Sequence, residues 1–334
     1  MTTQTALTVH QTARPHGFPT RGHFTFVESP VPAPEPGTAL VENLYWSVDP
    51  YHREAMDDDS IWTLNAPMEG RTIGRVVESR APGLAEGEIV LHREGWRTHS
   101  LVRPEGASRL PEFAGVPLSA HLGILGGTGL TAYVALTRIA RLQPGEELFV
   151  SAAAGGVGTA AGRLARLLGA GRIVGSTGSA RKAAYLVDEV GYDAAFTYRE
   201  APVADRLARL APGGIDVYLD NVGGDHLEAA IGALRPHGRI AWCGAVAQYN
   251  EPDGPPPAPR NLFTMVEKSL RLEGFLVANH RDAQQELYDF AVPHLREGGA
   301  LRPDETVVDG FEHIVDAFLS MLRGANTGKM LVRA

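Results

Sequence analysis

The sequence predicts an α/β protein with a doubly wound parallel sheet and a second, β-rich domain. From about residue 126 to 297, apolar strand-like segments alternate with turns and helical stretches, a rhythm typical of parallel βαβ units. Before about residue 125, Gly and Pro interrupt short strand-like segments, and the tail from 298 returns to strand, helix and strand. We therefore expect one β-rich domain from residues 1–125 and 298–334, with an α/β domain at residues 126–297 between its two parts.

Each element is assigned from an apolar or β-branched run that ends at Gly, Pro or polar residues. The expected strands of the first domain are Ala39–Leu44, Arg75–Ser79, Ile89–His92 and Thr98–Val102. The expected strands of the parallel sheet are Glu147–Ser151, Arg172–Ser176, Ala194–Tyr198, Val217–Asn221, Arg239–Gly244 and Leu270–Val277. The tail is expected to add a strand at Glu305–Val308, a helix at Gly310–Arg323 and a final strand at Lys329–Val332.

Bulk composition limits the classes of protein to which this chain can belong. With 334 residues the chain exceeds the ~250–300 residues at which one hydrophobic core stops growing, which favours two domains. The net charge of −8 disfavours a nucleic-acid binder, which needs a basic face. The single cysteine, Cys243, excludes an intrachain disulfide and a CxxC redox pair. We expect a cytoplasmic protein, because the first residues lack the apolar core of a secretory signal and no apolar run is long enough to span a membrane.

The strongest local signal is a glycine-rich turn between a strand and a helix. The apolar segment Leu148–Ser151 is followed by Ala153-x-Gly155-x-x-Gly158 and then by a helical apolar pattern. Small residues at these positions permit a tight turn, a close approach of the backbone to a pyrophosphate and close packing of helix on strand. The free N–H groups at the helix start would then face the phosphates. The turn therefore predicts dinucleotide binding.

The next strand bears on which dinucleotide is bound. NAD sites carry an Asp or Glu about 20 residues past the glycines, where it holds the ribose 2′-hydroxyl. Here the stretch 172–179 has no carboxylate, and it is followed by Arg181 and Lys182. Together with Ser179, these cations would attract the 2′-phosphate of NADPH, although they could also be solvated residues in the first turn of a helix. Because the helix dipole disfavours cations in a first turn, NADPH is the favoured cofactor.

Metal and nucleophile chemistry find little support in the sequence. The twelve histidines form no HExxH or comparable cluster, no metal site is expected, and no GxSxG elbow is present. Hydride transfer from a nicotinamide would then need hydrogen-bond donors that stabilise the oxyanion developing on the substrate. Tyr249, just after the segment Trp242–Gly244, and Tyr51 are candidates, while a purely structural role stays open for each.

Several segments together resemble one known family. They are Leu44–Tyr51, Gly126–Tyr133, Ala152–Gly158, Asp220–Gly224, Gln248–Asn250 and Asn326–Lys329. On these segments, which run along nearly the whole chain, the sequence resembles the zinc-independent medium-chain dehydrogenase/reductase enzymes of the prostaglandin reductase and alkenal double-bond reductase branch. The resemblance implies a GroES-like catalytic domain, a Rossmann NADPH-binding domain, an active site in the cleft between them and a homodimer.

The resemblance also implies roles for individual residues. The pyrophosphate would be bound by Gly155, Gly156 and Val157, with Thr128 nearby. The 2′-phosphate and adenosine ribose would be surrounded by Ser179, Lys182 and Tyr198. The nicotinamide half would be lined by Asn221, Cys243, Gly244, Phe275 and Asn326, with Tyr249 as the catalytic donor and Tyr51 facing it from the other domain. Two features differ from the family pattern, His52 in place of Met and the segment 57–62, and both bear on the substrate.

These features lead to an expected reaction. NADPH would reduce the carbon–carbon double bond of an α,β-unsaturated ketone or aldehyde at the β-carbon, while Tyr249, with Tyr51, hydrogen-bonds the carbonyl oxygen as enolate charge grows. Two alternatives stay open. The same site could reduce a quinone, or the chain could bind NADPH without turnover.

Overall fold

The computed structural model describes residues 5–251, 254, 257–296 and 299–334, and the chain divides into two compact units. The β-rich unit consists of Met1–Phe113, Thr306–Asn326 and Met330–Ala334. The α/β unit consists of Ala114–Glu305 and Thr327–Lys329. The expected domain border at 297–298 lies outside the described residues.

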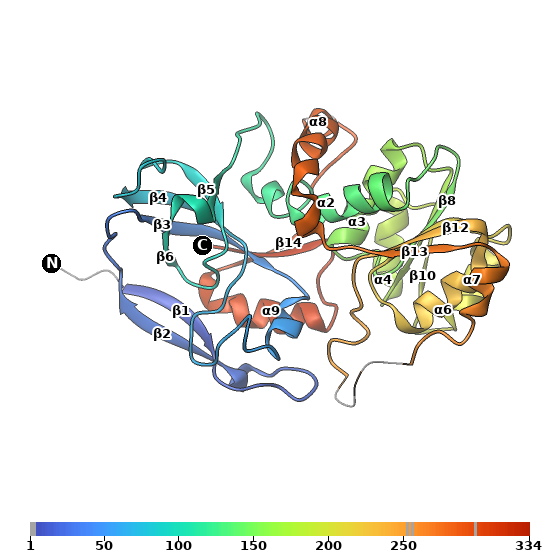
Figure 1. Ribbon diagram of the computed structural model, residues 1–334, viewed down its shortest axis with the longest axis horizontal. Helices are drawn as coiled ribbons and strands as arrows, with labels where there is room; N and C mark the ends of the chain where they lie inside the picture. The colour runs from blue at the N-terminus through green and yellow to red at the C-terminus, as the bar shows by residue number, and fades with distance from the viewer. Residues whose placement is uncertain (1–4, 252–253, 255–256, 297–298) are drawn as a thin grey trace. The chain divides into compact units, whose positions relative to one another are not determined.

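The β-rich unit is built around a seven-stranded sheet (Figure 1). Its order is β14 (Glu305–Asp309), β15 (Lys329–Arg333), β3 (Ala39–Val48), β4 (Thr72–Ser79), β5 (Ile89–His92) and β7 (Ala107–Arg109), with β6 (His99–Val102) paired to β3. A separate antiparallel pair joins β1 (Thr5–Gln11) to β2 (Phe24–Pro30). The main apolar core of this unit includes Trp46 of β3, Trp96, and Phe318 of helix α9 (Ile314–Leu322).

The α/β unit contains a six-stranded parallel sheet. Its order is β10 (Ala194–Thr197), β9 (Arg172–Thr177), β8 (Glu147–Val150), β11 (Ile215–Asp220), β12 (Leu234–Trp242) and β13 (Arg271–Gly274). The helices are α2 (Gly127–Val134), α3 (Gly156–Leu167), α4 (Ala180–Tyr185), α5 (Val203–Leu210), α6 (Gly224–Ala233), α7 (Phe263–Glu267) and α8 (Gln284–Leu295). Numbered from β8, the strands run 3-2-1-4-5-6, the order of a doubly wound dinucleotide-binding sheet, so the predicted fold class is confirmed.

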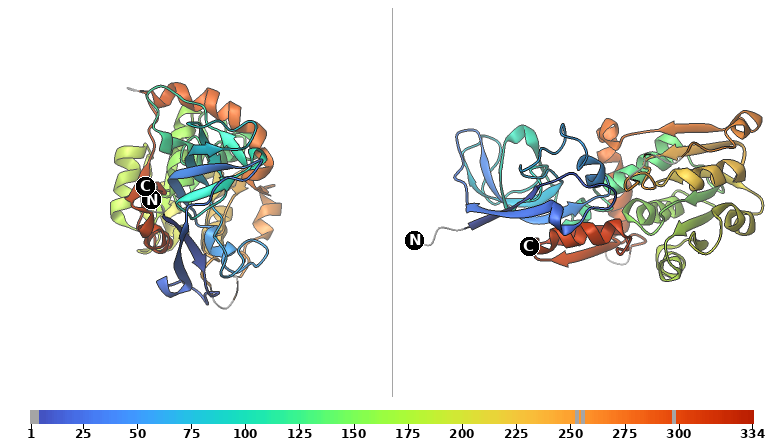
Figure 2. Two further views of the ribbon diagram at one scale, coloured as in Figure 1. Left: turned by 90° about the vertical axis from the view of Figure 1, so that its left-hand side faces the viewer. Right: turned by 90° about the horizontal axis from the view of Figure 1, so that it is seen from below.

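Helices lie on both sides of this sheet (Figure 2). On one face the rings of Phe149, Phe196 and Tyr218 stack in a row, with centroids 6.1 Å and 4.9 Å from that of Phe149. This row belongs to the same buried cluster as Leu207 of α5 and Leu227 of α6, so these two helices cover that face. Strands β8 and β11 are adjacent at the centre of the sheet, which brings their carboxyl ends together.

Several strand borders differ from those expected. Strand β12 begins at Leu234 and not at Arg239, because residues 235–238 form an irregularity between two paired stretches: Ile215 of β11 pairs with Leu234, and Val217 with Arg239. Strand β13 ends at Gly274, since a 3-10 helix follows at Val277–Ala283. The pair β1–β2 was not expected, because twelve residues separate the strands and no short hairpin turn signals their pairing.

Candidate functional site

The glycine-rich turn lies between the end of β8 and the start of α3. Ala152 adopts a left-handed conformation (φ 47°), and Gly155 N–H donates to the Ala152 carbonyl at 2.9 Å, which closes the turn. Gly155 is the residue before the first turn of α3. A Cβ atom on Gly158 would lie 2.3 Å from the carbonyl oxygen of Ala153, so only glycine lets the helix approach the strand this closely.

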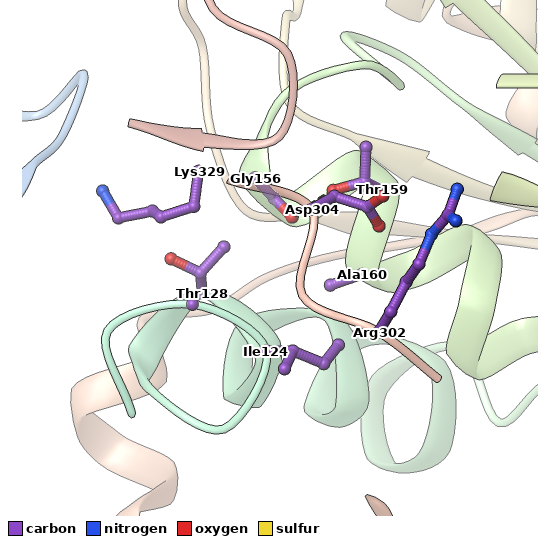
Figure 3. Close-up of a pocket in the computed structure, with 9 residues that line it drawn as sticks. Ile124, Thr128, Gly156, Thr159, Ala160, Arg302, Asp304 and Lys329 are labelled. Atoms are coloured by element: carbon purple, nitrogen blue, oxygen red, sulfur yellow. Dashed lines mark hydrogen bonds between the residues drawn. The ribbon is translucent and has the colours of Figure 1, made fainter. Parts of the chain in front are cut away.

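A small pocket lies beside this turn (Figure 3). A Cβ on Gly156 would lie 2.9 Å from the Thr128 Cγ2 atom, which shows how closely α2 approaches the start of α3. Lys329 also lines the pocket and reaches it because the preceding residue, Gly328, donates from its N–H to the Ala154 carbonyl at 2.8 Å. The predicted phosphate residues Thr128 and Gly156 are thus brought together with Lys329, which was not among the predicted site residues.

The acidic residue in this pocket is already paired. The Asp304 carboxylate accepts from Arg163 Nε at 2.5 Å and from Arg163 Nη2 at 2.8 Å, and both side chains are more than nine-tenths buried. The Tyr185 hydroxyl donates to the same carboxylate. Because Asp304 is neutralised by Arg163, its charge does not prevent an anion from binding near Gly156.

A second group of residues forms where β9 and β10 end. Ser179 caps α4 by accepting from the Lys182 N–H at 3.4 Å. The Arg199 guanidinium lies 5.9 Å from the ring centroid of Tyr198. A Cβ on Gly178 would lie 3.5 Å from the Tyr198 hydroxyl and 3.8 Å from Arg199 Nη2, so these residues lie around one point of the backbone.

This second group is basic. Lys182 is buried, and burial lowers the pKa of its ammonium group, as do the neighbouring charges of Arg181 and Arg199. Within the described ranges, none of these three cations forms an ion pair with a carboxylate. Three cations that repel one another without a counter-ion favour the binding of an anion. Arg199 was not predicted, because its proximity to Lys182 depends on how the ends of β9 and β10 align.

Another cluster occupies the carboxyl ends of β8, β11 and β12. Asn221 donates from its backbone N–H to Ser151 Oγ at 2.9 Å and from Nδ2 to the Ser151 carbonyl at 2.7 Å. The Cys243 thiol donates to Asn221 Oδ1 at 3.1 Å, and burial raises the pKa of this thiol to about 12. The structure therefore brings Asn221 and Cys243 into contact, with Gly244 adjacent: a Cβ on Gly244 would lie 3.3 Å from the Asn221 carbonyl oxygen.

The segment that carries Tyr249 folds back onto this cluster. Val246 N–H donates to the Asn221 carbonyl at 3.1 Å, and Ala247 N–H donates to the Val222 carbonyl at 3.2 Å. Tyr249 follows in a turn and is half-buried. Phe275 N–H donates to the Trp242 carbonyl at 3.2 Å, which places Phe275 beside the end of β12.

The remaining predicted residues belong to the β-rich unit. The Tyr51 hydroxyl accepts from Arg93 Nη2 at 3.2 Å, and burial, followed by the charge of Asp49, raises the pKa of Tyr51. His52 is fully buried, its Nδ1 accepts from the Asp49 N–H at 3.3 Å, and its ring packs among aromatic side chains. Asn326 is also buried in this unit. The packing of His52 agrees with a structural role for the histidine that departs from the family pattern.

The described residues also bear on metal sites and membrane spans. In the parts of the chain that the structure describes, no group of three His, Cys, Asp or Glu side chains is arranged to hold a metal ion. Among the same residues, no helix combines the length and the apolar character that crossing a membrane requires.

Comparison with known proteins identifies the family. Residues 8–110 match the family described as the N-terminal domain of oxidoreductase, and residues 156–292 match the family described as zinc-binding dehydrogenase. The chain is 38% identical to mouse prostaglandin reductase 1 over 325 residues, 95% of this chain and 96% of that protein. It is 35% identical to the NADP+-dependent 2-alkenal reductase of Nicotiana tabacum over 301 residues, 88% of this chain and 86% of that protein.

A solved structure shows the same architecture. The crystal structure of CurA from Vibrio vulnificus in complex with NADPH superposes with a TM-score of 0.89 at 30% identity, covering 98% of this chain and 99% of that chain. The sequence matches extend over nearly the full length of the relatives, and the structural match includes both units. The chain therefore belongs to the zinc-independent medium-chain dehydrogenase/reductase family of oxidoreductases, in the branch of the prostaglandin and 2-alkenal reductases.

Proposed function

We propose that this protein is an NADPH-dependent reductase that saturates the carbon–carbon double bond of α,β-unsaturated ketones or aldehydes. The observation that carries the cofactor assignment is the group of Arg181, Lys182 and Arg199 at the ends of β9 and β10, with no carboxylate paired to it among the described residues. A 2′-phosphate would supply the missing negative charge. The name of the tobacco relative supports a substrate with a conjugated carbonyl group, because a 2-alkenal is an α,β-unsaturated aldehyde.

The described residues fit the rest of the cofactor. The pyrophosphate would be held at Gly155, Gly156 and Val157, next to Thr128, because these residues stand at the N-terminal end of α3, where the helix favours a phosphate. The 2′-phosphate and ribose would meet Ser179, Lys182 and Tyr198, to which we add Arg199. The nicotinamide half would meet Asn221, Cys243, Gly244, Phe275 and Tyr249, and we propose Asn326 as a further contact.

The bound cofactor would supply a hydride for the β-carbon of the substrate. We propose that Tyr249 donates a hydrogen bond from its hydroxyl to the substrate carbonyl oxygen and so stabilises the enolate charge as it develops. Tyr51 would be a second donor. Because burial raises the pKa of Tyr51, its hydroxyl stays protonated near neutral pH and can act as a donor. Solvent can protonate the α-carbon, so no general acid of the protein is required for that step.

A substrate panel tests the reaction. NADPH oxidation would be followed with enals, enones, saturated aldehydes and quinones at matched concentrations. We expect enals and enones to be reduced and saturated aldehydes to be inert, with the saturated ketone or aldehyde as product. A quinone rate far above every enone rate would replace the proposal with a quinone reductase, and NADPH binding without oxidation of any substrate would indicate a non-catalytic binding protein.

We also propose that the protein forms a homodimer through the edge of the parallel sheet. Among the described residues, β13 is the last strand of the sheet, so one side of its backbone has no neighbouring strand there. Phe263 and Val266 lie in α7, the helix before this strand, and Leu276 follows the strand by two residues; their side chains are 71%, 69% and 71% exposed. Exposed apolar side chains that flank an edge strand in the sequence favour pairing with a second copy of the chain.

A further inference from the structure

A buried carboxylate lies behind the predicted nicotinamide residues. Asp220, the last residue of β11, is fully buried. Its Oδ1 atom accepts from the Tyr218 hydroxyl at 2.7 Å, from the N–H groups of Val222 and Gly223 at 2.8 Å each, and from Ser151 Oγ at 3.2 Å. Its Oδ2 atom is buried and has no hydrogen-bond partner among the residues that the structure describes.

Burial and hydrogen bonding act on the Asp220 carboxylate in opposite directions. Burial is the larger effect and raises the pKa of Asp220, while hydrogen bonds from Gly223, Tyr218, Val222 and Ser151 limit that rise because they stabilise the charged form. No Lys, Arg or His within the described ranges forms an ion pair with Asp220. The negative charge is therefore solvated by four donors on one oxygen and is not neutralised by a cation.

This charge lies directly behind the residues proposed to contact the nicotinamide. Asn221 is the next residue in the chain, and its backbone N–H donates to Ser151, which in turn donates to Asp220. The N–H groups of Cys243 and Gly244 donate to the Asp220 carbonyl at 3.0 Å and 3.2 Å. Burial is the largest cause of the raised pKa of the Cys243 thiol, and the negative charge of Asp220 is the next. The electric field of Asp220 therefore reaches Cys243.

We propose that the Asp220 carboxylate favours binding of the oxidised, positively charged nicotinamide over the neutral reduced form, and thereby makes bound NADPH a stronger hydride donor. This inference rests on the proposed function, because it requires the nicotinamide to bind beside Asn221 and Cys243. Loss of a hydride removes two electrons and one hydrogen nucleus from the neutral ring and leaves one positive charge on it. A buried negative charge stabilises that positive charge strongly, since the protein interior screens the attraction less than water does. Asp220 thus acts through the electrostatic environment, as a positioning residue that need not touch the substrate.

Equilibrium binding of the two cofactor forms tests the proposal. The Kd values of NADP+ and NADPH would be measured for the wild type, Asp220→Asn and Tyr218→Phe. In Asp220→Asn, we expect the ratio Kd(NADP+)/Kd(NADPH) to rise ~10-fold, because the charge that favours the oxidised ring is lost. Tyr218→Phe is the matched control: it removes one donor to the same oxygen but keeps the charge, so its ratio should stay within ~2-fold of the wild type.

The ratio separates an electrostatic role from a structural one. A defect in folding would weaken both cofactor forms, so an unchanged ratio in Asp220→Asn would overturn the inference. If Asp220→Asn does not fold, Asp220→Ser, whose hydroxyl can still accept from the Val222 and Gly223 N–H groups, should show the same rise in ratio. A wild type that binds NADH as tightly as NADPH would instead count against the proposed function itself.

Discussion

At the scale of single residues, the charge of Lys182 is the clearest determinant of cofactor choice. Its ammonium group is buried next to Arg181 and Arg199, so neutralising it removes a charge that a 2′-phosphate would otherwise meet. Lys182→Ala should raise the KM for NADPH by ~10-fold or more, the effect of one lost charge-assisted hydrogen bond, and should leave the KM for NADH almost unchanged. Steady-state kinetics with both cofactors measure this.

The matched control is Arg209→Ala, which removes an exposed cation from α5. It should change neither KM value appreciably. Arg199→Ala should act in the same direction as Lys182→Ala. Equal losses for NADPH and NADH in Lys182→Ala would contradict the assignment of the 2′-phosphate to this cluster.

Tyr249 is the residue on which the proposed chemistry depends most. In Tyr249→Phe the ring is kept and only the hydroxyl donor is lost, so kcat should fall by ~100-fold while the Kd for NADPH stays close to that of the wild type. Tyr133→Phe, on α2, serves as a matched control and should retain full kcat. If kcat of Tyr249→Phe equals that of the wild type, Tyr249 is not part of the mechanism.

Residue-level prediction from the sequence worked where a local pattern carries the chemistry. The spacing of Gly155 and Gly158 requires a tight turn, and the structure contains it. Arg199 was missed because its proximity to Lys182 arises from the alignment of two neighbouring strand ends, which a linear pattern does not record. Lys329 was missed for the same reason, since a segment far along the chain brings it to Gly156.

At the scale of elements, the contact between β8 and α3 depends on Gly158. A methyl group there would lie 2.3 Å from the Ala153 carbonyl oxygen, so Gly158→Ala forces the helix away from the strand. We expect a loss of ~1–3 kcal/mol in the free energy of unfolding, the usual cost of overpacking, and weaker NADPH binding. Denaturant titration and fluorescence titration with NADPH measure these quantities.

Gly106→Ala is the matched control for this substitution. A Cβ on Gly106 meets no atom within 4 Å, and its φ is not in the left-handed region. Its stability should therefore stay within ~0.5 kcal/mol of the wild type. A Gly158→Ala protein as stable as the Gly106→Ala protein would show that the turn relaxes without cost.

Element borders were predicted well in regular strands and poorly at irregularities. Strand β5, Ile89–His92, was predicted to the residue, because its apolar run is short and ends at polar residues. The start of β12 was misplaced because residues 235–238 contain Pro236 and Gly238, which argue against a strand, and His237 adopts a left-handed conformation (φ 65°). Tertiary pairing with β11 determines this stretch, and the local sequence does not.

At the scale of the whole molecule, two buried histidines should make stability depend on pH. Burial lowers the pKa of His92 to about 3 and that of His226 to about 4, well below the usual 6.5. The unfolded chain therefore binds protons between pH 6.5 and about 4 that the folded chain does not, so acid favours unfolding in this window. Stability should fall by up to ~1.4 kcal/mol per pH unit for each histidine.

Denaturant titrations at pH 7 and pH 5 of the wild type and His92→Gln measure this effect. The variant starts less stable at pH 7, because the hydrogen bond between His92 Nε2 and Asn43 Oδ1, 2.9 Å long, is altered, but it should lose less stability on acidification. Burial raises the pKa of Asp220 and Glu305, so these carboxyl groups stabilise the folded state as the pH falls and oppose the effect of the histidines. The informative quantity is therefore the change in the free energy of unfolding with pH, compared between the wild type and His92→Gln. Parallel slopes would mean that His92 does not contribute.

The proposed dimer follows from a feature that no single residue reveals. A parallel sheet buried on both faces by helices still has two edges, and in this molecule the edge strand β13 is flanked in the sequence by the exposed side chains of Phe263, Val266 and Leu276. The wild type should therefore have about twice the 35.8 kDa mass of one chain in light scattering. The double variant Phe263→Asp/Leu276→Asp should shift the mass to that of one chain, because two carboxylates would face their copies across the interface.

The matched control is Val187→Asp, at another exposed apolar side chain of the α/β unit, which should leave the dimer intact. A wild type that is monomeric at micromolar concentration would rule the dimer out.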